Sequence, residues 1–229
     1  MLTTVLFPLN WLLSFVATLL RLGAGGSGSP DVEPAEPLIL YEFEGCPFCR
    51  ITREQVSETG VTVHVKPCPK GGKRFRPDVT EKGGKAQFPY LIDPNAKAGD
   101  DAVAMYESAD IARYLRERFG GASRPLIQWT GPINHALSQF AVLARYMSGT
   151  IARPASAPEQ PLRFYACERS PGGRLIKEML CSKELEYIWT SRASGRQATP
   201  LLEDPQTGSS VIGALPILDY LRQTYPRAV

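Results

Sequence analysis

The sequence lacks an excess of charge of either sign. Its 26 lysines and arginines against 23 aspartates and glutamates leave a formal net charge of +3. Whole-chain binding to a polyanion depends on a strongly basic surface, so nucleic acid is not predicted as a partner. With 229 residues, of which 43% are hydrophobic, the chain is long enough to bury a core as one large domain or two small ones.

Cysteine is also scarce. Five cysteines are too few for a disulfide scaffold, and two of them, Cys46 and Cys49, lie in one Cys-Pro-Phe-Cys tetrapeptide. Such a pair is typical of working thiols in a reducing compartment, here the cytoplasm or an equivalent of the plastid stroma. A zinc site needs two more ligands, and only His64 and Cys68 lie nearby without a second paired motif. No metal site is predicted.

A charged segment is missing from the beginning of the chain. Residues 2–20 hold no charged side chain, and no lysine or arginine precedes them, so the basic region of a signal peptide is absent. Nineteen uncharged residues are long enough to span a bilayer as a helix. Membrane association through residues 2–20 therefore stays open, either as a spanning anchor or as a helix lying in the interface, beside the favoured interpretation of a helix packed on protein.

An internal repeat with a shift of 124 residues holds without gaps from residue 7 to Glu54, and the shift falls to 111 where Pro89 matches Pro200. FPLNWLLSFVATLLRLGAG (7–25) aligns with GPINHALSQFAVLARYMSG (131–149), and the register continues through a Pro-rich linker. Identical pairs include Pro8/Pro132, Asn10/Asn134, Ser14/Ser138, Ala17/Ala141, Arg21/Arg145, Tyr41/Tyr165, Pro47/Pro171, Arg50/Arg174 and Glu54/Glu178. The chain is therefore predicted to be two copies of one unit.

The repeat predicts equivalent helices over residues 8–22 and 132–146, packed on each other about a pseudo-twofold axis. Helical spacing of the apolar residues predicts which side chains face protein. In the first helix these are Leu9, Leu12, Leu13, Val16, Ala17 and Leu20; in the second they are Ile133, Ala136, Leu137, Phe140, Ala141, Ala144 and Met147.

The remaining pattern divides the chain into four segments. They are a hydrophobic helix with a Gly/Ser/Pro linker (1–36), a compact domain (37–120), a linker with an amphipathic helix (121–160) and a second compact domain (161–229). In the first compact domain we expect strands over 38–43 and 61–66, a helix from Pro47 to about Glu58, a basic loop over 66–85, two short strands around the turn-rich DPNAKAGDD, and a last helix ending at Gly120.

Three segments carry a family resemblance: YEFEGCPFC, FPYLID and YESADIARYL. Over residues 38–119 the chain resembles a glutaredoxin or the N-terminal domain of a glutathione S-transferase. As a whole it resembles bacterial and plastid proteins with two such N-terminal domains in tandem. The resemblance implies an α/β fold of two tandem thioredoxin-like domains, each preceded by a hydrophobic helix.

Cys46 is the predicted nucleophile. A cysteine just before a helix lies beside free backbone N–H groups and the positive end of the helix dipole, which stabilise its thiolate. Cys49, one turn further along, is placed to attack a mixed disulfide on Cys46 and close an internal disulfide. Pro47 suits the first turn and stiffens the loop, while Phe48 presents an apolar ring beside the pair. Cys68, Cys167 and Cys181 are expected to be ordinary core or loop residues.

The resemblance also implies a glutathione site. In that family the residue before a cis-proline offers its backbone to glutathione, which here is Phe88 before Pro89, and Glu107 with Ser108 matches the pair that grips the γ-glutamyl group. The alternative is that Ser108 only caps its helix. The basic loop either supplies a cation for the glycine carboxylate or is simply solvated.

The second copy lacks these groups, because Ser170 and Gly173 align with the two cysteines and Ile212-Gly213-Ala214 aligns with the Tyr-Glu-Ser segment. We therefore expect a glutathione-dependent thiol–disulfide oxidoreductase, with glutathione as co-substrate and glutathionylated or disulfide-containing proteins as partners. Two alternatives remain: a non-redox interaction protein built on tandem thioredoxin-like domains, and a glutathione S-transferase or isomerase that uses Cys46.

Overall fold

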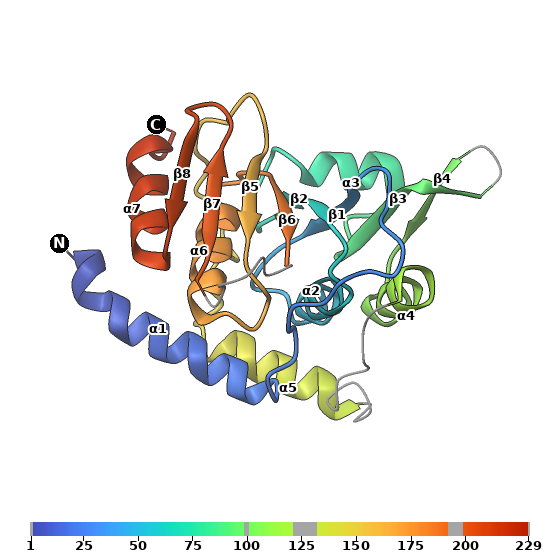
Figure 1. Cartoon of the computed structure of the whole chain (residues 1–229), viewed down its shortest axis with the longest axis horizontal. Coiled ribbons are helices and arrows are strands. Elements are labelled where there is room, and N and C mark those ends of the chain that lie inside the picture. The colour runs from blue at the N-terminus through green and yellow to red at the C-terminus, as the bar shows by residue number, and fades with distance from the viewer. Residues whose placement is uncertain (1, 99–100, 121–131, 192–198, 229) are drawn as a thin grey trace.

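The computed structural model describes residues 2–98, 101–120, 132–191 and 199–228, so residues 121–131 of the predicted linker lie outside the described residues. Eight strands form one sheet in the order β4-β3-β1-β2-β6-β5-β7-β8 (Figure 1). The first unit comprises α1 (Leu2–Leu20), β1 (Leu38–Glu42), α2 (Pro47–Thr59), β2 (Val63–Pro67), α3 (Arg76–Gly83), β3 (Tyr90–Ala98), β4 (Asp101–Met105) and α4 (Ser108–Phe119). The second unit comprises α5 (Pro132–Leu143), β5 (Leu162–Tyr165), α6 (Pro171–Ser182), β6 (Tyr187–Thr190), β7 (Leu201–Asp204), β8 (Ser209–Ile212) and α7 (Ala214–Thr224).

The two units meet where β2 pairs with β6 in antiparallel register. His64 lies opposite Ile188, and these two residues are also related by the 124-residue shift. A pseudo-twofold axis therefore passes through this pair of residues. Val63 lies opposite Trp189, and both side chains are buried in a core that runs through both units. The sheet thus continues across the join instead of leaving two exposed edges.

Hydrogen bonds repeat along with the strands. In the first unit the Tyr114 hydroxyl donates to the carboxylate of Asp93 at 2.6 Å. In the second unit the Tyr220 hydroxyl donates to Asp204 at the same distance. In both cases the last helix is tied to the strand that follows the central β-α-β segment, and the order of strands and helices from β5 to α7 matches that of β1, α2, β2, β3, β4 and α4.

Two local expectations were wrong. The basic loop contains a helix, α3, whose Val79 packs with Phe75, Tyr41 and Cys68 on the sheet face opposite to the main core. In the sequence, Phe75 and Val79 are surrounded by charged residues, so the segment shows no helical periodicity of apolar residues. Most of the turn-rich segment predicted after Ile92 is strand instead, because β3 continues past a bulge between Asp93 and Lys97 and pairs with β4; residues 99–100 lie outside the described residues.

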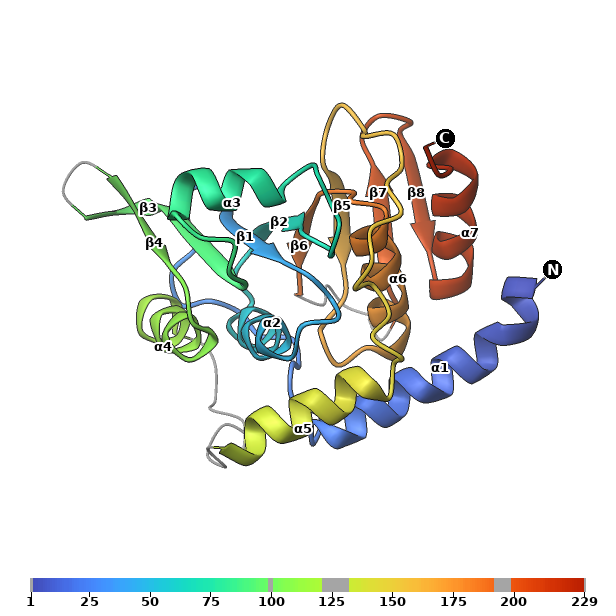
Figure 2. The ribbon, with the colours of Figure 1, turned by 180° about the vertical axis from the view of Figure 1, so that it is seen from behind.

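Helices α1 and α5 lie side by side along one edge of the molecule (Figures 1 and 2). Each packs on the other unit's helix, α1 on α6 and α5 on α2. The Ser14 hydroxyl donates to the carbonyl of Pro171 at 2.9 Å, and the Ser138 hydroxyl donates to the carbonyl of Pro47 at 2.7 Å. Equivalent serines on α1 and α5 therefore bond to equivalent prolines at the starts of α6 and α2.

The predicted faces of these helices were wrong for most residues, although Ala17 and Ala141 are buried as expected. The side chains buried on both are small or polar, whereas most of the expected core residues are exposed; Leu12, for example, is 52% exposed. Buried residues are Ser14, Ala17, Asn134, Ser138, Ala141 and Val142; exposed ones include Leu9, Leu12, Val16, Ile133, Phe140 and Met147. Within the described residues, no helix combines the length and apolarity needed to cross a bilayer.

Buried ion pairs decide the orientation of both helices. Arg21, just after α1, donates to Glu54 on α2 at 2.7 Å and to the side chain of Asn134 on α5. Arg145, just after α5, repeats this arrangement with Glu178 on α6, at 2.7 and 2.8 Å. Because leaving one of these buried charges unpaired costs several kcal/mol, the polar side must face inward.

Candidate active site

Cys46 is the N-cap residue of α2. Its backbone is extended (φ −100°, ψ 121°), Pro47 occupies the first helical position, and its sulfur accepts the backbone N–H of Cys49 at 3.4 Å. A hydrogen bond from the Cys49 thiol, more backbone N–H groups and the charge of Arg53 lower the pKa of Cys46 to about 7, although burial acts in the opposite direction. The site can therefore hold a thiolate at neutral pH.

Cys49 behaves oppositely. It is fully buried, and burial together with the neighbouring Cys46 raises its pKa well above the ordinary value. All five cysteines are free thiols. The pair thus consists of one group that ionises and one neutral thiol that donates to it, the arrangement that a nucleophile and a resolving thiol require.

Phe88 lies in the same buried cluster as the two thiols, together with Phe43 and Cys181. The peptide bond between Phe88 and Pro89 is cis, as the resemblance implies. The ring of Phe88 meets that of Phe43 edge-on, with 6.0 Å between the centroids. The structure therefore brings Cys46, Cys49 and Phe88 together.

Glu107 and Ser108 are further from this cluster. Glu107 occupies the N-cap position of α4 with a φ of 65°, its side chain makes no capping bond, and its carboxylate accepts from the amide of Gln87 at 2.5 Å. Ser108 is the first helical residue and is buried, so it is not the N-cap residue. Glu107 lines a cavity of about 420 Å³ and Ser108 one of about 100 Å³, so the two side chains do not share one cavity.

Several cations of the basic segment already have structural partners. The guanidinium of Arg74 donates to the carbonyls of Glu184 and Ala155 in the second unit. Arg76 donates to the carbonyls of Cys68 and Pro69 and lies over the ring of Phe88, 4.7 Å from its centroid. Arg76 is therefore the cation of this segment placed against the thiol cluster.

The second unit covers the Cys46 loop. Ser138 on α5 bonds to the carbonyl of Pro47, and the ring of His135 lies 5.5 Å from that of Phe48. A Cβ atom on Gly45 would lie 1.7 Å from the Thr150 hydroxyl oxygen, so only glycine fits there. Cys46 is only 5% exposed as a result. The contact between α5 and the Cys46 loop was not predicted from the sequence. The match of Ser14 with Ser138 in the repeat is the sequence feature that indicates it.

The equivalent helix start in the second unit has the same backbone geometry without a thiol. Ser170 is the N-cap residue of α6, and its hydroxyl accepts the backbone N–H of Gly173 at 3.1 Å. A hydroxyl there satisfies the helix but cannot form a disulfide. Among the described residues, no group of three His, Cys, Asp or Glu side chains is arranged to hold a metal ion.

A buried charge cluster joins the two units behind these helix starts. Arg53 pairs with Glu42 and with Glu44, the latter at 3.0 Å. Lys177, which the repeat aligns with Arg53, pairs with Glu168, which aligns with Glu44. Burial lowers the pKa of Lys177 to about 7. The positive charge of Arg53 also acts on Cys46, so this cluster links the unit interface to the thiol.

Comparison with known families gives one match. Residues 40–123 match the model of the glutathione S-transferase N-terminal domain. This segment, which contains Cys46, the cis-proline and Glu107-Ser108, is therefore a thioredoxin-fold domain of that type within a mixed α/β chain, and its fold is consistent with glutathione binding. Searches of curated proteins and of solved structures found no match.

Proposed function

We propose that the protein is a glutathione-dependent thiol–disulfide oxidoreductase in which Cys46 is the nucleophile. The observation that carries this proposal is the helix-capping Cys46 with its pKa lowered to about 7 beside the neutral, buried Cys49. A transferase that only activates glutathione has no need for a second thiol donating to the first. Dithiol exchange uses both.

The reaction starts from a glutathionylated protein. The Cys46 thiolate attacks the glutathione sulfur, the S–S bond breaks, and the target protein leaves as a thiolate that takes up a proton. Glutathione is then bonded to Cys46. A second glutathione thiolate attacks the glutathione sulfur of this adduct, giving glutathione disulfide and restoring the Cys46 thiolate. Alternatively, Cys49 loses its proton and attacks the Cys46 sulfur, which releases glutathione and leaves an intramolecular disulfide that two glutathione molecules reduce.

The glutathione molecule is proposed to lie across Pro47, Phe48, Phe88 and Pro89, with its γ-glutamyl end at Glu107 and Ser108. The 49% exposure of Phe48 and the position of Phe88 beside the thiols support the central part. Glu107 reaches toward this region through Gln87, the residue directly before Phe88. Arg76 is the proposed partner of the glycine carboxylate, since its guanidinium already lies over Phe88.

The test is turnover of a glutathionylated peptide, coupled to glutathione reductase. Cys46→Ser should abolish turnover, Cys49→Ser should retain the route that needs one thiol, and Cys167→Ser, which removes a half-buried cysteine of the second unit outside the thiol cluster, should leave turnover unchanged. Full activity of the Cys46→Ser protein would refute the mechanism. Mass spectrometry of the oxidised parent distinguishes a Cys46–Cys49 disulfide from a glutathione adduct.

The domain arrangement is part of the proposal. We infer that residues 37–120 form the working domain, that residues 161–229 are a second thioredoxin-like domain without the thiols, and that residues 1–36 and 121–160 each supply a helix that packs on the opposite domain. The matching hydrogen bonds of Tyr114 and Tyr220 and of Ser14 and Ser138 support this inference. The second domain then serves to cover and stabilise the Cys46 loop.

A transferase or isomerase is the second candidate for Cys46, favoured by the family of residues 40–123. It predicts conjugation of glutathione to an electrophile such as 1-chloro-2,4-dinitrobenzene. The two activities separate on their substrates, because conjugation consumes an electrophile and leaves a glutathionylated peptide intact. Conjugation at a rate well above that of glutathione alone, without turnover of the glutathionylated peptide, would favour this candidate.

Attachment to a lipid surface is a further candidate role, favoured by the exposed apolar face of α1 and α5. Neither helix contains a charged residue, and Trp11 stacks on Phe15 with 5.7 Å between the ring centroids. An aromatic pair flanked by leucines suits a helix lying in a bilayer interface. Cosedimentation of the whole chain with phosphatidylcholine vesicles should be lost in Leu12→Glu with Phe15→Glu, while turnover at Cys46 stays unchanged.

A further inference from the structure

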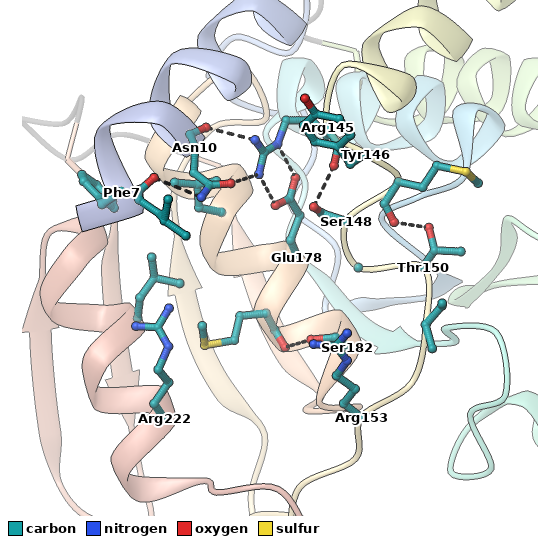
Figure 3. A pocket seen from close by; sticks show the side chains of 17 residues that line it. Phe7, Asn10, Arg145, Tyr146, Ser148, Thr150, Arg153, Glu178, Ser182 and Arg222 are labelled. Carbon is teal, nitrogen blue, oxygen red and sulfur yellow. Dashed lines mark hydrogen bonds and ion pairs between the residues drawn. The ribbon is translucent and has the colours of Figure 1, made fainter. Parts of the chain in front are cut away.

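A large cavity among the described residues is lined mostly by the second unit, and neither Cys46 nor Cys49 lines it. It measures about 530 Å³ and lies between the N-terminal part of α1, helices α6 and α7, and the segment from Arg145 to Arg153 (Figure 3). Cavities of this size hold drug-sized molecules. None of the predicted glutathione-site residues lines it.

The repeat identifies the equivalent place in the first unit. Leu175, Arg222 and Asn10 line the large cavity where Ile51, Arg116 and Asn134 line the small cavity of about 100 Å³. Ile51 and Asn10 align with Leu175 and Asn134 through the shift of 124 residues. Arg116 aligns with Arg222 through the match of IARYLRERF with ILDYLRQTY. The same site is therefore open in one unit and nearly closed in the other.

Two substitutions between the units change the chemistry of the site. In the first unit Arg116 donates to the side chain of Gln55 at 2.7 Å, and its charge also acts on Glu58. The second unit has Met179 in place of Gln55 and Ser182 in place of Glu58, and both line the large cavity. The equivalent arginine, Arg222, is thus without the amide and the carboxylate that serve Arg116.

The charges lining the large cavity leave an excess of positive charge. Arg145 is neutralised by Glu178, as the dashed lines of Figure 3 show. Arg222 on α7 and Arg153 lie at the other end of the cavity, away from that pair. Arg222 is paired with exposed Asp219 at 2.9 Å, so the two arginines and this aspartate together leave about one net positive charge. One carboxylate balances it.

The walls beyond the arginines are apolar. They come from α1, α6, α7 and the segment after α5, and consist of Leu6, Phe7, Leu175, Met179, Leu218 and Ile151. An apolar wall with guanidinium groups at one end matches a ligand with a hydrocarbon chain and a planar anionic head, because arginine binds carboxylates in a bidentate geometry. A wholly polar anion would leave the apolar wall unmatched.

We propose that this cavity binds a medium-chain fatty acid, with its carboxylate at the end of the cavity that Arg153 and Arg222 line and its chain against the apolar wall formed by α1, α6 and α7. This site is independent of the thiol chemistry proposed for Cys46. Its occupant would bridge the N-terminal helix and the second unit, and thereby stabilise the folded chain by linkage.

The test is isothermal titration calorimetry of the full chain with decanoate, below the concentration at which it forms micelles. Saturable binding of one decanoate is expected. Decanol, which has the chain without the charge, and acetate, which has the charge without the chain, should each bind at least tenfold more weakly. Equal affinity for decanol and decanoate would overturn the proposal, as would absence of saturable binding; tighter binding of decyl phosphate would overturn the carboxylate assignment.

Exchange of residues between the units gives the decisive variants. Met179→Gln with Ser182→Glu places the residues equivalent to Gln55 and Glu58 in the large cavity. The new amide and carboxylate should bind Arg222 and weaken decanoate binding at least tenfold. The matched control, Gln55→Met with Glu58→Ser in the first unit, should leave it unchanged. Arg153→Ala with Arg222→Ala provides an independent variant, with circular dichroism to verify folding. Unchanged affinity in both cavity variants would refute the site.

Discussion

The helix starts at Cys46 and Ser170 have the same construction and different chemistry. Each is an N-cap residue followed by proline, each accepts the backbone N–H three residues on, and each has its proline carbonyl bonded by a serine from the opposite unit's helix. Only Cys46 carries a group whose charged form this environment stabilises. The comparison shows that the backbone of the helix start is a structural requirement of the repeat, whereas the reactivity depends on one sulfur atom.

Removing that sulfur should have the largest effect. Cys46→Ser makes the first helix start equivalent to the second and should reduce turnover of a glutathionylated peptide by about 10³-fold or more, because a hydroxyl forms no mixed disulfide. Ser170→Cys in this background should not restore turnover, since Gly173 provides no second thiol and Gly213 replaces Glu107 there. Restoration by Ser170→Cys would show that the two helix starts are chemically equivalent.

The equivalent ion pairs Arg21–Glu54 and Arg145–Glu178 should contribute similarly to the free energy of unfolding. Arg21→Ala and Arg145→Ala each leave a buried glutamate unpaired and should lower the free energy of unfolding by about 3–5 kcal/mol. Urea denaturation followed by circular dichroism measures this effect. Arg113→Ala removes an exposed pair with Asp110 and should cost less than about 1 kcal/mol. A small cost for Arg21→Ala would mean that its charge is not needed to hold α1.

The pH dependence of alkylation tests the electrostatics of Cys46 alone. Because its pKa is lowered to about 7, the thiolate is the main form above pH 7 and falls about tenfold per pH unit well below it. Iodoacetamide labelling of Cys46, followed by mass spectrometry, should slow by about a hundredfold between pH 8 and pH 5. A midpoint near pH 8.5, typical of a free cysteine, would remove the proposed activation.

The proposed γ-glutamyl contacts of Glu107 and Ser108, which the second unit lacks, should have a smaller effect on turnover than the loss of Cys46. Glu107→Ala with Ser108→Ala should raise the glutathione concentration needed for turnover by about tenfold or more, because charge-assisted hydrogen bonds are lost. Alkylation of Cys46 should change little. Identical glutathione titrations of parent and double variant would remove both residues from the binding site.

The serine bonds should give the smallest change. Ser14→Ala and Ser138→Ala each remove one hydrogen bond to a proline carbonyl and should cost about 1 kcal/mol of folding stability. Ser138→Ala should also speed alkylation of Cys46, since α5 covers that loop, whereas Ser14→Ala should not. Equal alkylation rates in both variants would show that the contact at Pro47 does not limit access.

Parts of the site followed from local rules. The start of α2 at Pro47 and the position of Cys46 as its cap were predicted and are confirmed. Each depends on a few neighbouring residues or on a family motif. The sequence did not show which residue is the N-cap of α4, because the N-cap residue, Glu107, makes no capping hydrogen bond with its side chain.

What the sequence determined by itself is local and periodic. The alternation of Val63 and Val65, the proline at each helix start and the repeat that pairs Arg21 with Arg145 all follow from the order of residues. The tertiary structure decided which face of α1 and α5 is buried, because Glu54 and Glu178 lie on other helices and their charges must be paired. It also decided that the units share one sheet and that α5 covers Cys46, since those contacts join residues more than ninety positions apart.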